Sequence, residues 1–156
     1  MRRLIWLCSC LVLVGCGDVE SHVSHVGRWR LAGVECPGHA IAFKAYSELL
    51  VLEESTGTTE VTAGGCTSRL NDYPVRREDD TLKLMTTAAQ AISCTPNPCD
   101  QTVEVVFDGQ VSWQTSHCPA DLPSAKSPST LQLDNDMLVQ DVTAAGLKCT
   151  GTYVRQ

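Results

Sequence analysis

The stretch Gly27-Arg28-Trp29-Arg30-Leu31-Ala32-Gly33 carries the pattern from which the fold of this 156-residue chain can be inferred. Its large apolar side chains, Trp29 and Leu31, alternate with arginines, so one face is apolar and the other is charged. A period of two is typical of a β-strand with one buried face. We therefore expect the folded body to open with a strand that packs Trp29 and Leu31 against a core.

The same alternation recurs in later parts of the chain. It is found at residues 58–63, 81–86, 130–142 and 147–155. These segments are short, turn residues separate them, and no long amphipathic helix intervenes, which indicates eight or nine short strands. We predict an all-β antiparallel fold, either a sandwich or a barrel. A small meander barrel is favoured because closure leaves no unpaired edge strand.

A β-hairpin is predicted around Asp108-Gly109, between two runs rich in valine. A two-residue loop would place Val105 opposite Ser112, which mixes apolar and polar side chains on one face. A three-residue loop that ends in Gly109 places Val105 opposite Val111 and keeps one face apolar. Because a half-buried hairpin needs one apolar face, we predict the second register, with a β-bulge at the glycine.

Four segments lack the strand pattern. Residues 40–46 and the alanine-rich residues 87–92 are expected to form short helical turns. Residues 69–80 are predicted to be a charged connection, because charged side chains surround Pro74 near its middle. Residues 118–129 hold three prolines and are predicted to be a loop.

Six cysteines of the folded body suit a disulfide framework: Cys36, Cys66, Cys94, Cys99, Cys118 and Cys149. An even number of cysteines in a small domain of an oxidising compartment predicts up to three disulfides, with 15 ways of pairing them. The turn-forming spacer Thr95-Pro96-Asn97-Pro98 favours one pair, Cys94 with Cys99.

A metal site is the alternative use of these cysteines. Zinc modules need paired cysteines or histidines at set spacings, and the chain has no C-x-x-C pair. The histidines do not supply such a set, since His22 and His25 fall in a tether, His39 in a loop and His117 beside a cysteine. We therefore predict no metal and no cofactor.

The N-terminus carries an apolar run, residues 4–14, behind Arg2 and Arg3. This layout is typical of a secretory signal, and the run is shorter than the roughly 20 residues that a transmembrane helix needs. An uncleaved membrane anchor and a buried strand are the alternatives, but two leading arginines disfavour a strand.

The run ends in Leu13-Val14-Gly15-Cys16, which resembles the lipobox of bacterial lipoproteins. The resemblance implies cleavage before Cys16, lipidation of that cysteine, and three parts of the chain: a signal peptide at 1–15, a lipidated tether at 16–25 and one β-barrel domain at 26–156. Because Gly17 rather than aspartate follows Cys16, it also implies the outer membrane of the cell envelope.

Charge limits the partners of the mature chain. Loss of Arg2 and Arg3 leaves 10 of the 12 basic residues against 18 acidic ones, a formal charge of about −8. Binding to nucleic acid or anionic lipid needs clustered lysine and arginine. We therefore predict no nucleic acid partner and a membrane contact made by the lipid anchor. The sequence leaves the oligomeric state open.

The opening Gly27-Arg28-Trp29 adds a second resemblance. The chain looks like a bacterial lipocalin-like lipoprotein, a family whose first strand opens with G-x-W. The resemblance implies that Trp29 closes one end of the barrel and that Arg155, near the end of the last strand, packs across it. The family's middle motif has no match here.

A weaker resemblance is to the META-domain envelope lipoproteins. Gly65-Cys66 and residues 87–94 look like that family's G-C-N box and its threonine-to-cysteine box, although Thr67 stands where the family has asparagine. Both families are β-rich, so the fold expectation is the same for either.

Three classes of function remain to be weighed. The first is a non-catalytic binding module that takes a small apolar or envelope-derived ligand. The second is a structural or interaction protein with a filled barrel core and no ligand. The third, an enzyme, is disfavoured because the chain has neither G-x-S-x-G nor H-E-x-x-H, so we predict no catalytic residue.

Overall fold

The computed structural model describes residues 23–86, 92–119, 129–144 and 146–156, and these residues form twelve β-strands. The strands are β1 (Gly27–Glu35), β2 (Ile41–Lys44), β3 (Tyr46–Leu52), β4 (Thr56–Ala63), β5 (Cys66–Glu78), β6 (Thr81–Leu84), β7 (Ile92–Thr95), β8 (Cys99–Phe107), β9 (Gln110–Cys118), β10 (Ser129–Asp134), β11 (Met137–Ala144) and β12 (Leu147–Arg155). None of the described segments is a helix that could cross a membrane.

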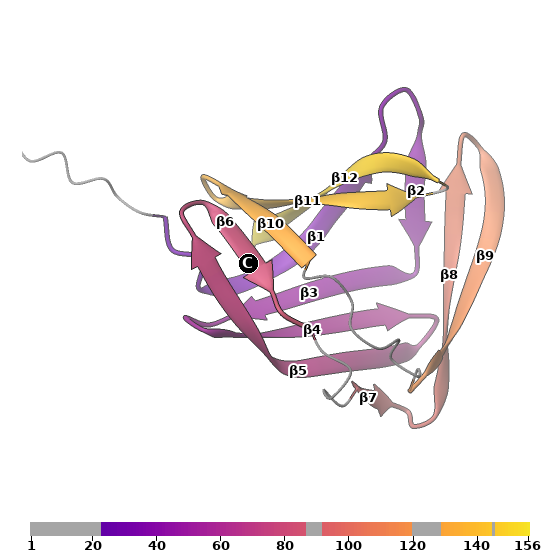
Figure 1. Cartoon of the computed structure of the whole chain (residues 1–156). Coiled ribbons are helices and arrows are strands. Elements are labelled where there is room, and N and C mark those ends of the chain that lie inside the picture. Colours follow the sequence, from indigo (N-terminus) through magenta and orange to yellow (C-terminus); the bar gives the residue numbers. More distant parts are fainter. Residues whose placement is uncertain (1–22, 87–91, 120–128, 145) are drawn as a thin grey trace, which may run out of the picture.

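Eight of the strands close into an antiparallel barrel (Figure 1). The order around the barrel is β1-β3-β4-β5-β6-β10-β11-β12, and β12 pairs with β1. Each strand therefore neighbours the next along the chain, apart from two insertions, β2 and β7 to β9. The predicted all-β meander barrel is confirmed, although the strands outnumber the eight or nine expected.

The barrel core follows the alternation of the sequence. Buried apolar side chains include Trp29, Leu50, Leu52, Tyr73, Leu82, Leu84, Leu131, Leu133 and Leu138. Each fully buried leucine contributes about 1.5–3 kcal/mol relative to an exposed one, before the entropy of ordering is counted. The predicted inward positions of the first strand and of residues 81–86 are thus confirmed.

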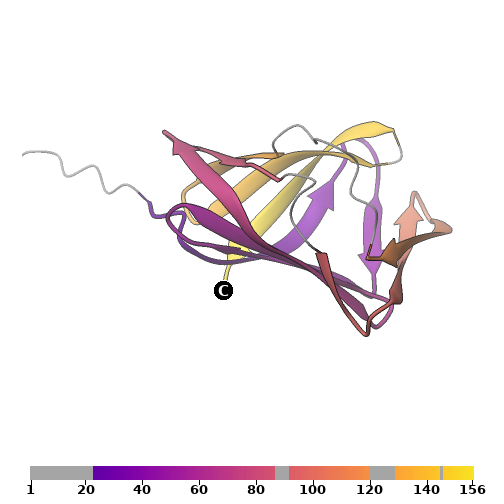
Figure 2. The ribbon, with the colours of Figure 1, turned by 60° about the horizontal axis from the view of Figure 1, so that its bottom comes forward.

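The inserted strands form a second sheet with the order β2-β8-β9. This mouth sheet, as we name it, stands at the end of the barrel opposite the segment 23–26 (Figures 1 and 2). Ala45 has a positive φ of 54° and separates β2 from β3, so the chain changes direction there and β2 leaves the barrel. The predicted helical turn at 40–46 is therefore wrong, and residues 87–91 of the second predicted turn lie outside the described residues.

Residues 69–80, predicted to be a connection, belong mostly to β5. Thr67–Leu70 of this strand pair with β7, and Val75–Glu78 pair with β6. Tyr73 and Val75 face the core while Arg76 is exposed, so the strand alternates despite its charge. The charged residues were read as a connection because they lie on the solvent face of a half-buried strand.

Three disulfides are present, and none of them is the predicted Cys94–Cys99 pair. They join Cys36 to Cys149, Cys66 to Cys99 and Cys94 to Cys118. The segment 95–98 does turn the chain, but it connects β7, paired to the barrel strand β5, with β8 of the mouth sheet. Because the two ends enter different sheets, each thiol meets a partner from elsewhere in the chain.

The hairpin β8–β9 adopts the register that we predicted against. Val105 lies opposite Ser112, and Phe107 lies opposite Gln110, so the loop has two residues. Asp108 and Gly109 both have positive φ, 48° and 79°, as a type I′ turn requires. The prediction assumed one buried face, but the β9 residues before Cys118 are all exposed.

Candidate functional site

One end of the barrel is closed by Trp29. Its indole Nε1 donates a hydrogen bond to the His25 carbonyl oxygen at 2.8 Å, and the ring has no exposed surface. The Arg155 guanidinium lies 4.2 Å from the ring centroid, a cation–π contact. Gly27 leaves room for it, because a Cβ there would come 2.7 Å from Arg155 Nη1. The predicted contact between Trp29 and Arg155 is therefore formed.

The segment 23–26 is fastened over this closed end. Arg77 donates to the Val23 carbonyl oxygen at 2.8 Å, and Arg155 donates to the carbonyl oxygens of Ser24 and Val26. His25, predicted to lie in a solvated tether, is 4% exposed, with its Nε2 3.1 Å from the Glu53 carbonyl oxygen. Contacts with the barrel are thus present at Val23, the first described residue, which lies three residues before the predicted domain boundary.

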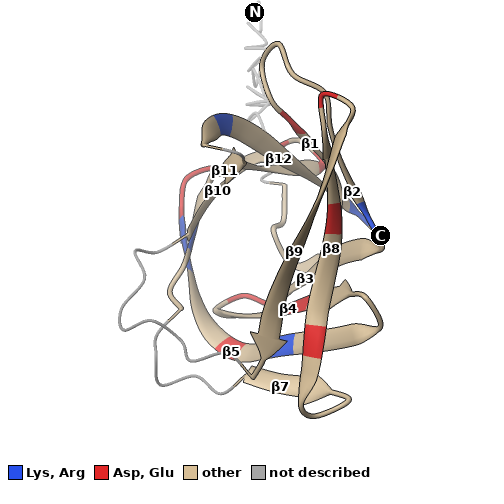
Figure 3. Cartoon of the chain, turned by 90° about the vertical axis from the view of Figure 1, so that its right-hand side faces the viewer, with Lys and Arg blue, Asp and Glu red and all other residues tan. Residues whose placement is uncertain are grey.

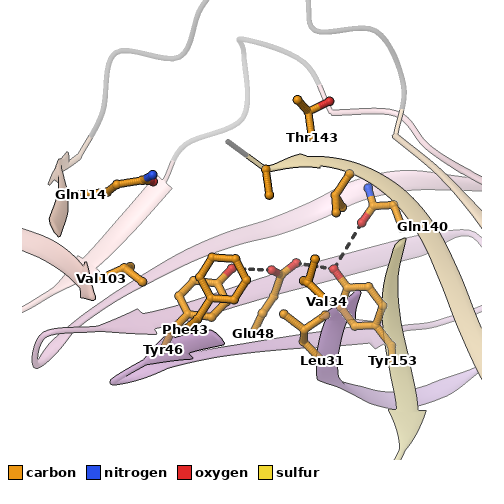
Figure 4. A pocket seen from close by; sticks show the side chains of 12 residues that line it. Leu31, Val34, Phe43, Tyr46, Glu48, Val103, Gln114, Gln140, Thr143 and Tyr153 are labelled. Carbon is orange, nitrogen blue, oxygen red and sulfur yellow. Dashed lines mark hydrogen bonds between the residues drawn. The ribbon is translucent and has the colours of Figure 1, made fainter. Parts of the chain in front are cut away.

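The opposite end of the barrel holds a cavity of about 280 Å³ (Figure 4). Its apolar walls are Leu31, Val34, Phe43, Val103, Val142 and Ala144. Its polar lining is Tyr46, Glu48, Gln114, Gln140, Thr143 and Tyr153. Most of these residues come from the barrel strands β1, β3, β11 and β12, and the others come from the mouth sheet. We name this cavity the mouth pocket.

A cluster of polar side chains lies in the mouth pocket. Glu48 accepts hydrogen bonds at both carboxylate oxygens, from the Tyr46 hydroxyl at 2.6 Å and from the Tyr153 hydroxyl at 2.8 Å. The Tyr153 hydroxyl also lies 3.3 Å from Gln140 Oε1. Figure 4 shows these groups in one row between the apolar walls. The pocket therefore offers carboxylate and amide oxygens to a ligand.

The tyrosines of this region remain protonated donors. Burial, and then the nearby charge of Glu48, raises the pKa of Tyr46 and of Tyr153 well above the ordinary value. Deeper in the barrel, burial raises the pKa of Tyr73 to about 12, and its hydroxyl lies 2.9 Å from Thr59 Oγ1. Neutral phenols are thus available as hydrogen-bond donors at any physiological pH.

The mouth sheet is anchored to the barrel at its base. The disulfides Cys66–Cys99 and Cys94–Cys118 hold β8 to β5 and β9 to β7. Gln101 of β8 adds a hydrogen bond from its Nε2 to the Val61 carbonyl oxygen at 2.8 Å. These anchors fix the position of Val103 and Gln114 on the wall of the pocket.

The mouth sheet is also tied at its tip. The Ala40 backbone N–H donates to Asp108 Oδ1 at 2.8 Å, and His39 Nδ1 lies 2.7 Å from the other carboxylate oxygen. His39 stacks on Phe107 with 5.1 Å between ring centroids. The turn of the hairpin is therefore fastened to the loop between β1 and β2, beside the mouth of the pocket.

The remaining sequence-predicted residues do not join the pocket. Leu13, Val14, Gly15 and Cys16 lie outside the described residues. His117 lies on exposed β9 with its Nδ1 against an Asp100 carboxylate oxygen. Among the described residues, no group of three or more His, Cys, Asp or Glu side chains could hold a metal ion.

Sequence reasoning did not identify Glu48, although its position on the inward face of β3 can be read from the sequence. Glu48, Leu50 and Leu52 share one side of β3, since side chains two apart point to the same face. That face is buried at both leucines. A single carboxylate on an otherwise apolar inward face is costly unless it is hydrogen-bonded or has a function, and so marks a candidate site.

Comparisons of the chain with protein-family models, curated proteins and solved structures found no match.

Proposed function

We propose that the chain is a lipid-anchored envelope lipoprotein whose barrel is a non-catalytic binding module for a small ligand. The observation that carries the proposal is the mouth pocket, a cavity of about 280 Å³ at one end of a barrel whose other end Trp29 closes. Small-molecule sites are typically concave, mostly apolar and equipped with a few polar groups. The mouth pocket is concave and combines six apolar lining residues with six polar ones.

A binding role fits the lining better than a catalytic one. The lining residues that the structure describes include no serine, cysteine or histidine, and so none of the common nucleophiles paired with a base. The acidic group, Glu48, already accepts hydrogen bonds from two neutral tyrosines. This arrangement holds a carboxylate in place and favours recognition over proton transfer.

Anchoring is supported by the lipobox-like residues 13–16 and by the pairing of all six body cysteines. Disulfides persist in oxidising compartments such as the periplasm. The test is the intact mass and membrane fractionation of the native protein. The unsubstituted chain should begin at Cys16, carry a diacylglyceryl and an acyl mass, and sediment with membranes. Cys16→Ala should remain soluble or uncleaved. An unmodified Cys16 in the native protein would contradict the proposal.

Binding is tested by native mass spectrometry of protein released from its own membranes in mild detergent. The unsubstituted protein should carry a noncovalent adduct. Val142→Phe, which fills the pocket from its wall, should lose it. The control Val111→Phe makes the same substitution on exposed β9 and should retain the adduct. Absence of a noncovalent adduct from all three proteins would contradict a ligand-binding role.

The second candidate, an interaction protein without a ligand, is favoured by one observation. Val111 and Trp113 on β9 are 56% and 65% exposed, which is unusual for such side chains. This candidate predicts that Trp113→Ser changes the cross-linking of the protein in intact cells, while Val142→Phe does not. The opposite pattern supports the binding module.

A further inference from the structure

Among the described residues that line the mouth pocket, one is anionic and none is cationic. Glu48 is half-buried, and its carboxylate makes no ion pair with any Lys, Arg or His that the structure describes. Its two described partners are the neutral hydroxyls of Tyr46 and Tyr153. The charge is therefore oriented by hydrogen bonds but is not neutralised.

The surroundings of Glu48 strengthen the attraction between its carboxylate and a positively charged partner. Leu31, Val34 and Val142 place apolar side chains in the walls beside it. Charges attract more strongly in such a medium than in water, and a buried charge without a partner is unfavourable. A ligand that brings a positive charge would therefore gain more here than at an exposed carboxylate.

Two aromatic rings lie beside the carboxylate. The rings of Phe43 and Tyr46 are tilted at 45° with 5.8 Å between their centroids, and Figure 4 shows both next to Glu48. Aromatic faces attract cations through the ring quadrupole. The amide oxygen of Gln140 offers one more acceptor close by. An ammonium group has three N–H donors, and this set of acceptors and rings matches it.

The volume of the pocket limits how much of a ligand it can bury. A cavity of about 280 Å³ corresponds to about nine non-hydrogen atoms, at the roughly 30 Å³ that one water occupies in the liquid. Diacyl lipids and long fatty acids are larger than this. The carboxylate of a fatty acid would in addition be repelled by Glu48, because like charges disfavour one another in a desolvated site.

We propose that the mouth pocket recognises a small primary amine with an apolar body, and that the Glu48 carboxylate binds its ammonium group. The apolar body packs against Leu31, Val34 and Val142, and the aromatic rings flank the charged head. The inference rests on the proposed binding function and narrows it to one chemical class. Tyr46 and Tyr153 are positioning residues, because they act by holding the carboxylate.

The experiment compares three ligands that share one aryl body: 2-phenylethylamine, 2-phenylethanol and phenylacetate. They carry a cationic, a neutral and an anionic head on a body of about the size that the pocket holds. Binding to the full folded domain is measured by titration calorimetry and by NMR shifts of the pocket residues. The amine should bind roughly 10- to 100-fold more tightly than the alcohol, as for a charge-assisted hydrogen bond, and phenylacetate should bind most weakly.

Glu48→Gln keeps the size of the side chain and an acceptor oxygen but removes the charge. It should reduce the amine-to-alcohol preference to about one while the alcohol still binds. The control Glu54→Gln removes an exposed carboxylate in the turn between β3 and β4 and should leave the preference unchanged. If Glu48→Gln does not fold, the preference of the unsubstituted protein among the three ligands still decides the question.

The outcomes separate the two proposals. Equal binding of the amine and the alcohol by the unsubstituted protein would overturn the amine inference and leave the binding module standing. An amine preference that survives in folded Glu48→Gln would overturn the role of this carboxylate. Absence of binding by all three ligands at millimolar concentration would overturn the amine inference, and the native mass spectrometry of the membrane-released protein would then decide by itself whether the binding module stands.

Discussion

Arg155 contributes to stability through contacts that no other residue type reproduces. Its planar guanidinium covers Trp29 and donates to two backbone carbonyl oxygens of the segment 23–26. Arg155→Ala should lower the free energy of unfolding by about 1–3 kcal/mol, from the lost hydrogen bonds and ring contact. Chemical denaturation measures the change. The control Arg30→Ala, at an exposed position on β1, should change the free energy of unfolding by no more than about 0.5 kcal/mol. Equal losses for both variants would contradict the role of Arg155 at this end of the barrel.

The tyrosines predict an unusual alkaline titration. The chain has three, Tyr46, Tyr73 and Tyr153, and the pKa of each is raised. A folded pKa above the unfolded value of about 10 means that the stabilising contribution is complete below pH 10 and is lost as pH rises through the folded pKa. Absorbance at 295 nm should therefore stay flat to about pH 11 and then rise together with unfolding.

The control for this titration is the unfolded chain. In concentrated guanidinium chloride the same three tyrosines should titrate near pH 10. A tyrosine that ionises near pH 10 while circular dichroism remains native would show that at least one hydroxyl is in contact with solvent. That result would contradict the buried hydrogen-bonded cluster around Glu48.

At the scale of single elements, the β8–β9 hairpin shows that turn geometry rather than the apolar side-chain pattern sets the register of the two strands. The apolar pattern favoured a three-residue loop, but this hairpin lies outside the barrel core, so burial does not select its register. The turn selects it, because Asp108 and Gly109 both adopt left-handed φ. Binary patterning predicts register well where both strands bury the same face and poorly where one strand, here β9 before Cys118, stays exposed on both faces.

The turn can be tested by substituting its glycine. A Cβ on Gly109 would meet no atom within 4 Å, so Gly109→Ala changes backbone preference alone at φ 79°. It should lower the free energy of unfolding by about 1–2 kcal/mol. Gly33→Ala is the matched control, because its Cβ would also be free but its φ is not left-handed. A loss as large in Gly33→Ala would show that the effect is not conformational.

At the scale of the whole molecule, the barrel could be predicted from the sequence and the mouth pocket could not. Alternation around Trp29, Leu82 and Leu131 identifies strands, and closure follows because open edges are unfavourable. Alternation does not say which sheet a strand joins, so β2, β8 and β9 were not separated from the barrel. Two of the three disulfides, Cys66–Cys99 and Cys94–Cys118, and the pocket depend on that separation, since they join residues from the two sheets.

The two ends of the barrel differ, and the proposed lipid on Cys16 would use this difference to orient the protein. The segment 23–26 is fastened beside Trp29 at one end of the barrel, whereas the mouth pocket lies toward the end at which the mouth sheet stands. Figures 1 and 3 show the mouth sheet, β2, β8 and β9, at that end. Cys16 precedes Val23 by seven residues, which span at most about 25 Å when fully extended. A lipid on Cys16 therefore keeps the closed end nearer the membrane and leaves the pocket facing away from it.

The tryptophans of the mature chain report this orientation. Trp29 is buried at the closed end and Trp113 lies on the mouth sheet. Energy transfer to a dansyl lipid in vesicles should be stronger from Trp29 than from Trp113. The Trp113→Phe variant gives the transfer from Trp29 alone. The difference between this variant and the unsubstituted protein gives the transfer from Trp113. A Cys16→Ala protein, which lacks the anchor, should show no transfer. Transfer from Trp113 equal to or above that from Trp29 would place the pocket against the bilayer, where a ligand would have to enter from the lipid phase.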